Sequence, residues 1–226
     1  MTEALMTLAN QARSAAGAPP LKWDPSLASA ALEHCRWMVR EGQLAHRYGG
    51  EPDLAQRAAL AGAHFSLIEE NIALGSNVGE IHDGWMNSPT HRANMLNPQV
   101  DRVGIAVLPT NGVLYTVADF DRGVEVLKPA EVESAVAALL RGKGLTILDK
   151  NADARAYCSQ GDDAPRSTSP QPGFRMLWQA SDLTQLPAPL VERIASGRYR
   201  KAAVGSCPAQ SSRGAFSAYR VAVLLY

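Results

Sequence analysis

The chain has 226 residues, of which 46 % are hydrophobic and 19 % are charged, a composition typical of a soluble globular protein. This length allows one large domain or two small ones, and no apolar run is long enough to cross a membrane. The formal net charge is zero, so the molecule as a whole has no electrostatic attraction for nucleic acid or anionic lipid.

The zero net charge hides a difference between the two halves. Residues 1–126 contain 9 Lys+Arg and 14 Asp+Glu, a balance of −5, whereas residues 127–226 contain 13 and 8, a balance of +5. We therefore predict two domains, 1–126 and 127–226. The simplest explanation of the charges is two solvated surfaces that also attract one another.

Two helices are predicted at the start of the chain. Thr2 caps the first helix, which ends at Gly17. Asp24 followed by Pro25 is a strong start signal for the second helix, which Gly42 ends.

Histidines are the main candidates for chemistry, and all five lie within the first 91 residues. His34 falls on the apolar stripe of the second helix, which favours a packing role. His46 lies in the loop just after that helix, where its ring can turn into a cleft. The first half of the chain is therefore the expected location of any site.

Two carboxylates are further candidates. Residues 65–73 are predicted to be extended, so that Glu69 and Glu70 point to opposite faces, one toward solvent and one toward the cleft. Glu80 follows Asn77 by three residues, which resembles a capping box. Glu80 therefore either caps a helix or faces the site.

A helix and a hairpin complete the first half. The helix that begins near Glu80 is interrupted, and His91 starts a further turn. Residues 103–108 and 113–120 are predicted to be strands, and the Asn-Gly pair between them predicts the turn of a β-hairpin.

The second half repeats this order of elements. Helices are predicted over 129–141, 151–158 and 189–196, strands over 145–148, 174–178, 202–207 and 218–226, and a mobile loop over 159–173. DRVGIAVL can be set beside RKAAVGSC, and VLYTVADF beside AYRVAVLLY. A decayed internal duplication is one hypothesis, and chance similarity of two common helix–hairpin units is the other.

The three cysteines bear on the cellular compartment. Cys35 lies in a helical pattern and reads as a small buried residue. Cys158 and Cys207 lie beside loop-like segments, and a Cys158–Cys207 disulfide is expected if the protein is exported. No basic and apolar leader precedes the first helix. The protein is therefore either cytoplasmic or an exported form whose leader has been replaced by a start Met.

Five motifs occur in a fixed order: NQARSAAGAPPLKWDPSLASAALEHC, GQLAH, ENIALGSN, EIHDGWMNSPTHRANMLNPQVDRVGIAV and GVLYTVADF. In this order they resemble the CAP superfamily of cysteine-rich secretory proteins, venom antigens and plant pathogenesis-related proteins, in its short bacterial form, the SCP domain. The resemblance covers about residues 3–122 and does not extend into the second half.

The resemblance implies an α+β fold, an α–β–α sandwich around a central antiparallel sheet, with a smaller C-terminal α+β extension. It also implies a cleft with two histidines and two acidic residues, which binds zinc or another divalent ion in several members. The matching positions are His46, Glu70, Glu80 and His91, with His46 and His91 as the metal ligands.

Three functional hypotheses follow. The first is a non-catalytic protein that binds a divalent metal, or part of a lipid, glycan or peptide, in this cleft. The second is a metal-dependent hydrolase, a peptidase or esterase, with Glu70 or Glu80 as general base. The third is an interaction module that uses the C-terminal half, around Arg198, Arg200 and Lys201. A purely structural network of the four cleft residues is the alternative to a binding site.

The resemblance also points to export, because members of the family are mostly secreted. We therefore expect a secreted or cell-envelope protein, with a cytoplasmic protein as the alternative. The sequence leaves the natural ligand and the oligomeric state open.

Overall fold

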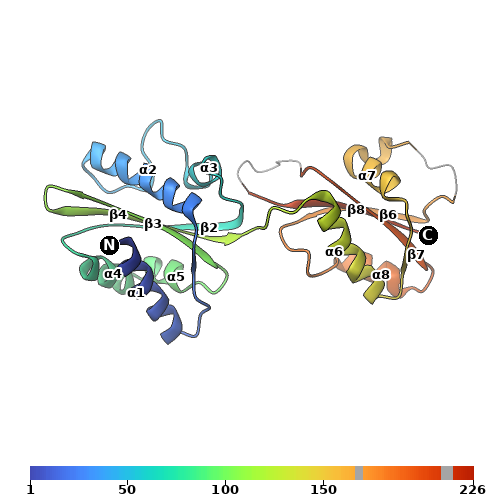
Figure 1. Cartoon of the computed structure of the whole chain (residues 1–226), viewed down its shortest axis with the longest axis horizontal. Coiled ribbons are helices and arrows are strands. Elements are labelled where there is room, and N and C mark those ends of the chain that lie inside the picture. Colours follow the sequence, from blue (N-terminus) through green and yellow to red (C-terminus); the bar gives the residue numbers. More distant parts are fainter. Residues whose placement is uncertain (166–169, 210–215) are drawn as a thin grey trace. The chain divides into compact units, whose positions relative to one another are not determined.

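The computed structural model describes residues 1–165, 170–209 and 216–226. The chain divides into two compact units (Figure 1). Of the described residues, unit 1 comprises Met1–Gly123 with Phe216, and unit 2 comprises 124–165, 170–209 and Ser217–Tyr226. The division after Gly123 lies three residues before the boundary expected from the charge distribution.

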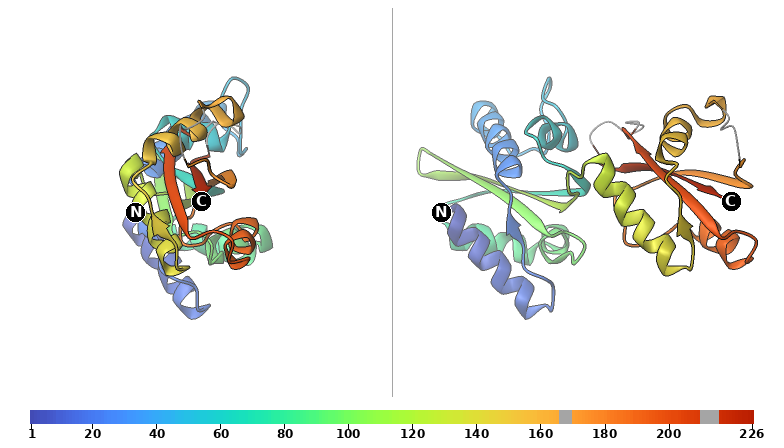
Figure 2. Two further views of the ribbon diagram at one scale, coloured as in Figure 1. Left: turned by 90° about the vertical axis from the view of Figure 1, so that its right-hand side faces the viewer. Right: turned by 45° about the vertical axis from the view of Figure 1, so that its right-hand side comes forward.

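Unit 1 is a three-layer α–β–α sandwich (Figure 2), which confirms the predicted fold class. Its sheet has the order β1-β3-β4-β2, formed by Lys22–Trp23, Arg102–Thr110, Val113–Gly123 and Phe65–Gly75. One face is covered by α2 and α3, which are Pro25–Glu41 and Leu54–Leu60. The other face is covered by α1, α4 and α5, which are Thr2–Ala15, Val78–Asn87 and Pro89–Leu96. The three long strands are antiparallel, and only the short β1 pairs in parallel.

Local signals set the element boundaries in unit 1. The Asp24 side chain accepts hydrogen bonds from the first backbone N–H groups of α2, and Gly42 ends that helix in the left-handed conformation. Asn111 and Gly112 have φ angles of 51° and 78°, which matches the two-residue turn expected between β3 and β4. The predicted helices and hairpin of this half are therefore confirmed. The expected cap of the first helix is wrong, because Thr2 is already the first residue of α1 and Met1 is its N-cap, without a side-chain hydrogen bond.

The edge strand β2 places two carboxylates on opposite faces of the sheet. The side chain of Glu69 accepts a hydrogen bond of 2.9 Å from Asn97, which follows α5. Glu70 points to the other face, where it contacts residues of α3 and of the loop after α2. Both side chains therefore contact protein groups, and neither simply faces solvent.

Unit 2 also contains a four-stranded sheet, with the order β5-β7-β8-β6. These strands are Thr146–Ile147, Lys201–Cys207, Tyr219–Leu225 and Phe174–Ala180. Its helices are α6, α7 and α8, which are Pro129–Gly142, Asn151–Gln160 and Ala188–Ala195, and a 3-10 turn follows at Gly161–Asp163. The C-terminal half is thus an α+β unit. The predicted loop 159–173 begins inside α7 and the 3-10 turn, and its residues 166–169 lie outside the described part of the chain.

The cysteines take the expected states. Cys158 and Cys207 form a disulfide with a Cα–Cα distance of 5.8 Å, and Cys35 is free and buried. Burial, which disfavours the thiolate, raises the pKa of the Cys35 thiol to about 12. In the described ranges, no helix has the length and apolar character that a transmembrane segment needs.

Candidate functional site

His46 lies in the segment between α2 and α3, at the edge of the sheet beside β2. Its Nδ1 is 2.8 Å from Oε1 of Glu70, and its side chain is 58 % exposed. Because a carboxylate can only accept, Nδ1 donates this hydrogen bond, which leaves Nε2 for a ligand. The hydrogen bond to Glu70 is the main reason why the pKa of His46 is raised.

Glu70 is held on its second oxygen by Arg57. The guanidinium of Arg57, on α3, forms an ion pair with Oε2 of Glu70, and its Nη1 lies 3.3 Å from Oε1 of Glu51. The same Nη1 donates to the backbone carbonyls of His46 and Pro52. Arg57 thus joins α3, β2 and the segment that carries His46.

A second histidine–glutamate pair lies behind the first. Nδ1 of His34, on α2, is 2.6 Å from Oε1 of Glu51, whose other oxygen accepts from the backbone N–H of Tyr48. Nε2 of His34 is 3.9 Å from Glu70. His34, Glu51, Arg57, Glu70 and His46 therefore form one chain of contacts, which we call the imidazole–carboxylate cluster.

Asp119 adds a third buried acid to this region. It is the register partner of Glu70 on the neighbouring strand β4, and it is fully buried. Neither of its oxygens accepts a hydrogen bond from a group in the described residues. Burial and then the charge of Glu70 raise the pKa of Asp119, so that this carboxyl is held in its neutral form and can donate to Glu70.

His91 lies on α5, in the opposite helical layer. Its helix, α5, is bound to β2 by amide groups: the side chain of Asn71 donates to the carbonyl of His91, and Asn94 donates to the carbonyl of Glu70. Burial and then the charge of His46 lower the pKa of His91. The structure thus joins His46 and Glu70 by a direct side-chain contact, and it holds the helix of His91 against the strand that carries Glu70.

Glu80 takes the alternative role that its spacing allowed. Its carboxylate accepts from the backbone N–H of Ser76 at 2.8 Å, and its own N–H donates to the side chain of Asn77. The described contacts of its side chain are with Ser76, at the start of α4, and do not reach His46, Glu70 or His91. These bonds also lower the pKa of Glu80.

The two acidic residues of the expected four-residue cleft are not free to bind a metal ion. Both oxygens of Glu70 are bound by Arg57 and His46, and Glu80 caps α4. Within the described ranges, no group of three or more His, Cys, Asp or Glu side chains has an arrangement that would hold a metal ion. Two imidazoles, His46 and His91, are the donors that remain.

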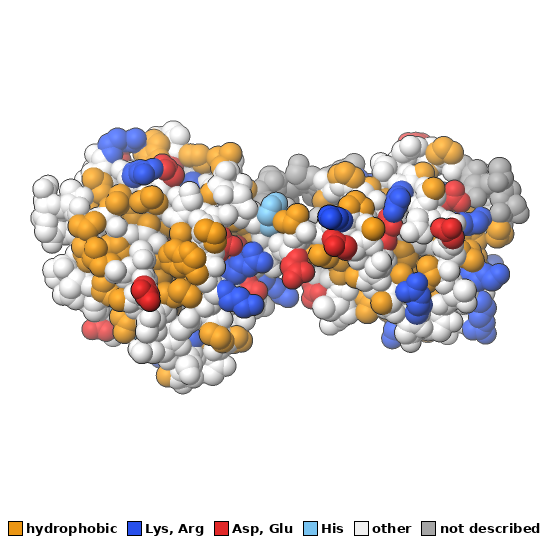
Figure 3. Space-filling model, viewed as in Figure 1, with side chains coloured by type: hydrophobic (Ala, Val, Ile, Leu, Met, Phe, Trp, Pro, Cys, Tyr) orange, Lys and Arg blue, Asp and Glu red, His pale blue; other side chains and the backbone are white. Residues whose placement is uncertain are grey.

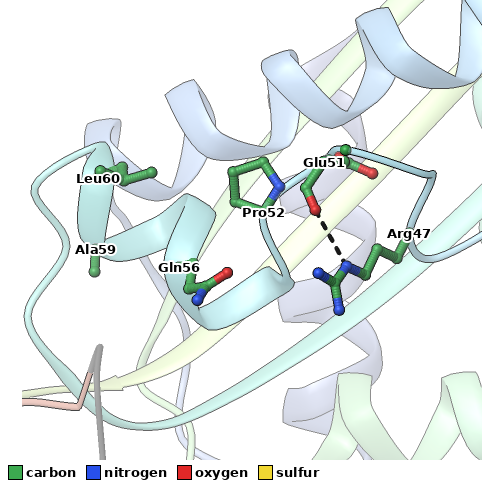
Figure 4. A pocket seen from close by; sticks show the side chains of 7 residues that line it. Arg47, Glu51, Pro52, Gln56, Ala59 and Leu60 are labelled. Atoms are coloured by element: carbon green, nitrogen blue, oxygen red, sulfur yellow. Dashed lines mark hydrogen bonds between the residues drawn. The ribbon is translucent and has the colours of Figure 1, made fainter.

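An open pocket of about 600 Å³ lies beside this cluster (Figure 4). Leu60 and Pro52 provide apolar walls, and Arg47 and Gln56 provide polar groups. Nε of Arg47 donates to the backbone carbonyl of Glu51, which fixes one end of the pocket. Glu51 therefore belongs both to the pocket and to the cluster.

Four members of this region do not follow from sequence reasoning. The sequence assigns His34 to packing and does not single out Glu51, Arg57 or Asp119. The sequence does contain a signal for Asp119. Asp119 follows Val117 by two residues in β4, so both side chains point to the same face of the sheet, and Val117 is buried on the face that α2 covers. The contacts of His34, Glu51 and Arg57 join different elements of the chain, and no local sequence pattern predicts them.

A sequence profile of the CAP family, the cysteine-rich secretory protein family, matches residues 6–120, just over half of the chain. The chain belongs to the CAP family. The match covers unit 1 of this CAP protein and ends before unit 2.

Individual relatives agree with this assignment. YkwD of Bacillus subtilis, described as an uncharacterized protein, is 28 % identical over 113 residues, which are 48 % of this chain and 43 % of YkwD. The chain thus matches less than half of that relative's length. An extracellular SCP-domain protein from Bacillus anthracis is 30 % identical, with a TM-score of 0.51 over 54 % of this chain and 40 % of that one.

A third relative supports the fold alone. An outer surface protein of Borrelia burgdorferi has 23 % identity and a TM-score of 0.51, over 54 % of this chain and 91 % of that one. The CAP protein therefore shares its fold with bacterial proteins, of which two are described as extracellular or outer-surface proteins.

The buried Asp121 makes the stability of this CAP protein depend on pH. Asp121 is fully buried, and burial raises its pKa to about 7, against the opposing charge of Arg102. Because the folded state holds this proton more tightly than the unfolded state, stability falls as the pH rises from about 4 to about 7. Asp121→Asn removes the titrating carboxyl and therefore this pH dependence of stability.

We compare the unfolding free energies of Asp121→Asn and the wild type. Their difference should change by about 1–3 kcal/mol in favour of the variant as the pH rises from about 4.5 to about 8. Urea denaturation of both proteins at the two pH values measures the change. The exposed acid Glu41, replaced by Gln, serves as the control and should show no such trend. An equal difference between Asp121→Asn and wild type at both pH values would contradict the raised pKa.

Proposed function

We propose that unit 1 is a non-catalytic binding module whose ligand lies between the imidazoles of His46 and His91. The observation that supports this most directly is the hydrogen bond from His46 to Glu70. It fixes one ring nitrogen and leaves Nε2 to a ligand, while the side chain remains more than half exposed. Arg57 fixes Glu70 in turn, so that the ring orientation is built into the fold.

The two imidazoles are chemically different. The pKa of His46 is raised and that of His91 is lowered, so there is a pH range in which His46 is a cationic donor and His91 a neutral acceptor. A small molecule that carries a carboxylate next to a hydroxyl group matches this pair. Glu70 and Glu80 are both engaged, which leaves neither as a ready general base and favours binding over hydrolysis.

A divalent cation such as zinc is the second candidate ligand. A histidine whose second ring nitrogen donates to a carboxylate is a common metal ligand, and His46 has this arrangement with Glu70. Only His46 and His91 would then serve as protein ligands, so we expect weak binding that strengthens as His46 loses its proton.

Export is the location that we propose for this protein. Its support is the Cys158–Cys207 disulfide and the description of the Bacillus anthracis relative as extracellular.

The difference between the two histidines gives a direct test of the site. In an NMR titration of the imidazole signals, we expect His46 to titrate above and His91 below the ordinary value of about 6.5. The reverse order would remove the basis of the proposal.

Ligand binding is tested with two probes, citrate and zinc. At a pH between the pKa values of the two histidines, citrate should shift the NMR signals of both imidazoles until the site is saturated. In His46→Ala and His91→Ala, the signal of the remaining histidine should not shift. Zinc should give heat in calorimetry only above the pKa of His46, and again not in these variants. Glu80→Gln is the matched control and should bind as the wild type does. Failure of both probes to bind the wild type would overturn the proposal.

A further inference from the structure

The two sheets of this protein follow the same plan. Unit 2 runs helix, short edge strand, helix, strand, helix and then a hairpin, and unit 1 has the same order with two additional helices, α3 before β2 and α5 before the hairpin (Figure 1). The short strand pairs in parallel with the first hairpin strand, and the remaining pairs are antiparallel. The strand orders β1-β3-β4-β2 and β5-β7-β8-β6 correspond one to one.

Hydrogen bonds at the edge strands align the two units residue by residue. In unit 1, the N–H of Lys22 donates to Asp101 and that of Asp24 donates to Val103. In unit 2, the same two bonds run from Thr146 to Arg200 and from Leu148 to Ala202. Val103 therefore corresponds to Ala202, and this places DRVGIAVL beside RKAAVGSC without a gap.

The second hairpin strand gives the same alignment. Val103 pairs with Phe120, and Ala202 pairs with Leu225. Phe120 thus corresponds to Leu225, which sets VLYTVADF beside the matching part of AYRVAVLLY, again without a gap.

The cysteines provide an independent check. Sγ of Cys35 lies 3.5 Å from the carbonyl oxygen of Tyr115, and Sγ of Cys158 lies 3.5 Å from that of Arg220. Tyr115 pairs with Leu108, and Arg220 pairs with Cys207. Cys35 therefore occupies the place of Cys158, and Leu108 occupies the place of the disulfide partner, Cys207.

We infer that unit 2 is a second, diverged copy of the CAP fold of unit 1, in which the site chemistry has been lost. In the pairing of β6 with β8, Arg175 and Leu224 stand where Glu70 and Asp119 pair in unit 1. Arg175 forms an ion pair with Asp162, and unit 2 contains no histidine. The chain therefore has two CAP folds and one imidazole–carboxylate cluster.

The correspondence is tested by moving the disulfide from unit 2 into unit 1. If Leu108 occupies the place of Cys207, Leu108→Cys should form a disulfide with Cys35, since the corresponding Cα atoms of Cys158 and Cys207 are 5.8 Å apart. Under denaturing, non-reducing conditions, the wild type should show one free thiol and Leu108→Cys none. Val107→Cys points to the other face of β3 and should show two.

Two free thiols in a folded Leu108→Cys protein would overturn the inference. Peptide mapping of this variant must also find the cross-link between Cys35 and the introduced thiol. If Leu108→Cys does not fold, a crystal structure of the wild type decides. Superposition of β5–β8 on β1–β4 must then bring the Cα atoms of residues 158 and 207 onto those of residues 35 and 108, and any other pairing contradicts the duplication.

One end of unit 2 carries a second, independent signal. The ends of α6 and α8 and the start of β7 lie together, because β5 follows α6 and its Thr146 bonds to Arg200. Exposed cations gather there: Arg141, Lys143, Arg193, Arg198, Arg200 and Lys201. Figure 3 shows Lys and Arg side chains over this part of unit 2. We call these six residues the cationic end.

Two of these six cations lie against aromatic rings. The guanidinium of Arg193 lies 5.3 Å from the ring centre of Phe174, and that of Arg198 lies 5.9 Å from that of Tyr199. In unit 1, the position of Arg200 is occupied by Asp101, so the two copies carry opposite charges at this point. At the next position both copies carry a cation, because Lys201 corresponds to Arg102.

We propose that the cationic end adsorbs to an anionic lipid surface. The exposed cations come from three places in the chain: the end of α6, the end of α8 with the segment after it, and the start of β7. Within the described ranges, the exposed large apolar side chains all lie elsewhere, which favours electrostatic adsorption without insertion. An exposed aromatic platform for bases is likewise absent among the described residues of this end, which argues against nucleic acid.

Vesicle co-sedimentation of the full chain tests this proposal. We expect binding to phosphatidylglycerol–phosphatidylcholine vesicles at low salt, and none to pure phosphatidylcholine or in about 0.5 M NaCl. The variant R198E/R200E should bind at least about tenfold more weakly. The matched control R36E/R40E removes the same charge from α2 of unit 1 and should bind as the wild type does.

Two results would overturn the lipid proposal. Equal loss in both double variants would show that net charge and not the cationic end is responsible. Binding to a DNA oligonucleotide without binding to the anionic vesicles would assign this end to a soluble polyanion.

Discussion

Gly104→Ala is expected to destabilise unit 1 by about 3 kcal/mol or more. A Cβ atom at this position on β3 would lie 2.0 Å from the backbone nitrogen of Ala28 and 2.2 Å from the carbonyl carbon of Leu27. Both atoms belong to the backbone of α2, so no side-chain rotation can relieve the overlap. The whole helix must move away from the sheet.

The displacement of α2 would also reach the site. This helix carries His34 and leads into the segment of His46. Urea denaturation measures the loss, and the imidazole NMR signals report whether the cluster is disturbed. Gly84→Ala is the control: Gly84 lies in α4 with open space around it, so alanine should stabilise the protein by about 0.5–1 kcal/mol. Similar effects of both substitutions would show that α2 does not contact β3 this closely.

Much of unit 1 could be predicted because its signals are local. Asp24-Pro25, Gly42 and Asn111-Gly112 each set a boundary through their own backbone preferences, and the structure has those boundaries. The close approach at Gly104 could not be predicted in the same way. A lone glycine in a strand indicates a close contact, but nothing near it in sequence names α2 as the partner.

The site was predictable only in part, for the same physical reason. His46 and Glu70 were found through family motifs, and the structure joins them. Arg57 has no motif of its own, and its role follows from three-dimensional contacts with Glu70 and Glu51. For Glu80, the local capping pattern described the observed contacts better than the family position did.

The internal repeat is hard to predict from the sequence. The two paired sequence segments share few residues, yet the strand register aligns them without a gap. A β-sheet requires alternation and register more than it requires particular residues, so the topology of two copies can agree after their sequences have diverged. Backbone hydrogen bonds, and not side-chain identity, therefore reveal the correspondence.

Arg57→Met is expected to cost about 3–5 kcal/mol of unfolding free energy near neutral pH. The Arg57 side chain is only 3 % exposed, and it faces the carboxylates of Glu51 and Glu70, which are buried as well. Methionine fills similar volume but leaves both acids without their cation. Urea denaturation of the variant and the wild type at neutral pH measures the loss.

The pKa of His46 shows whether Arg57 acts on the site or on stability alone. The charge of Arg57 lowers the pKa of His46, against the dominant effect of Glu70, so its removal should raise that pKa further. Arg36→Met removes an exposed arginine of α2 that pairs with Glu33, and it should change stability by less than about 0.5 kcal/mol and leave His46 unaffected. A stable Arg57→Met protein with an unchanged His46 titration would mean that Glu70 does not depend on Arg57, and that the orientation of the His46 ring has another cause.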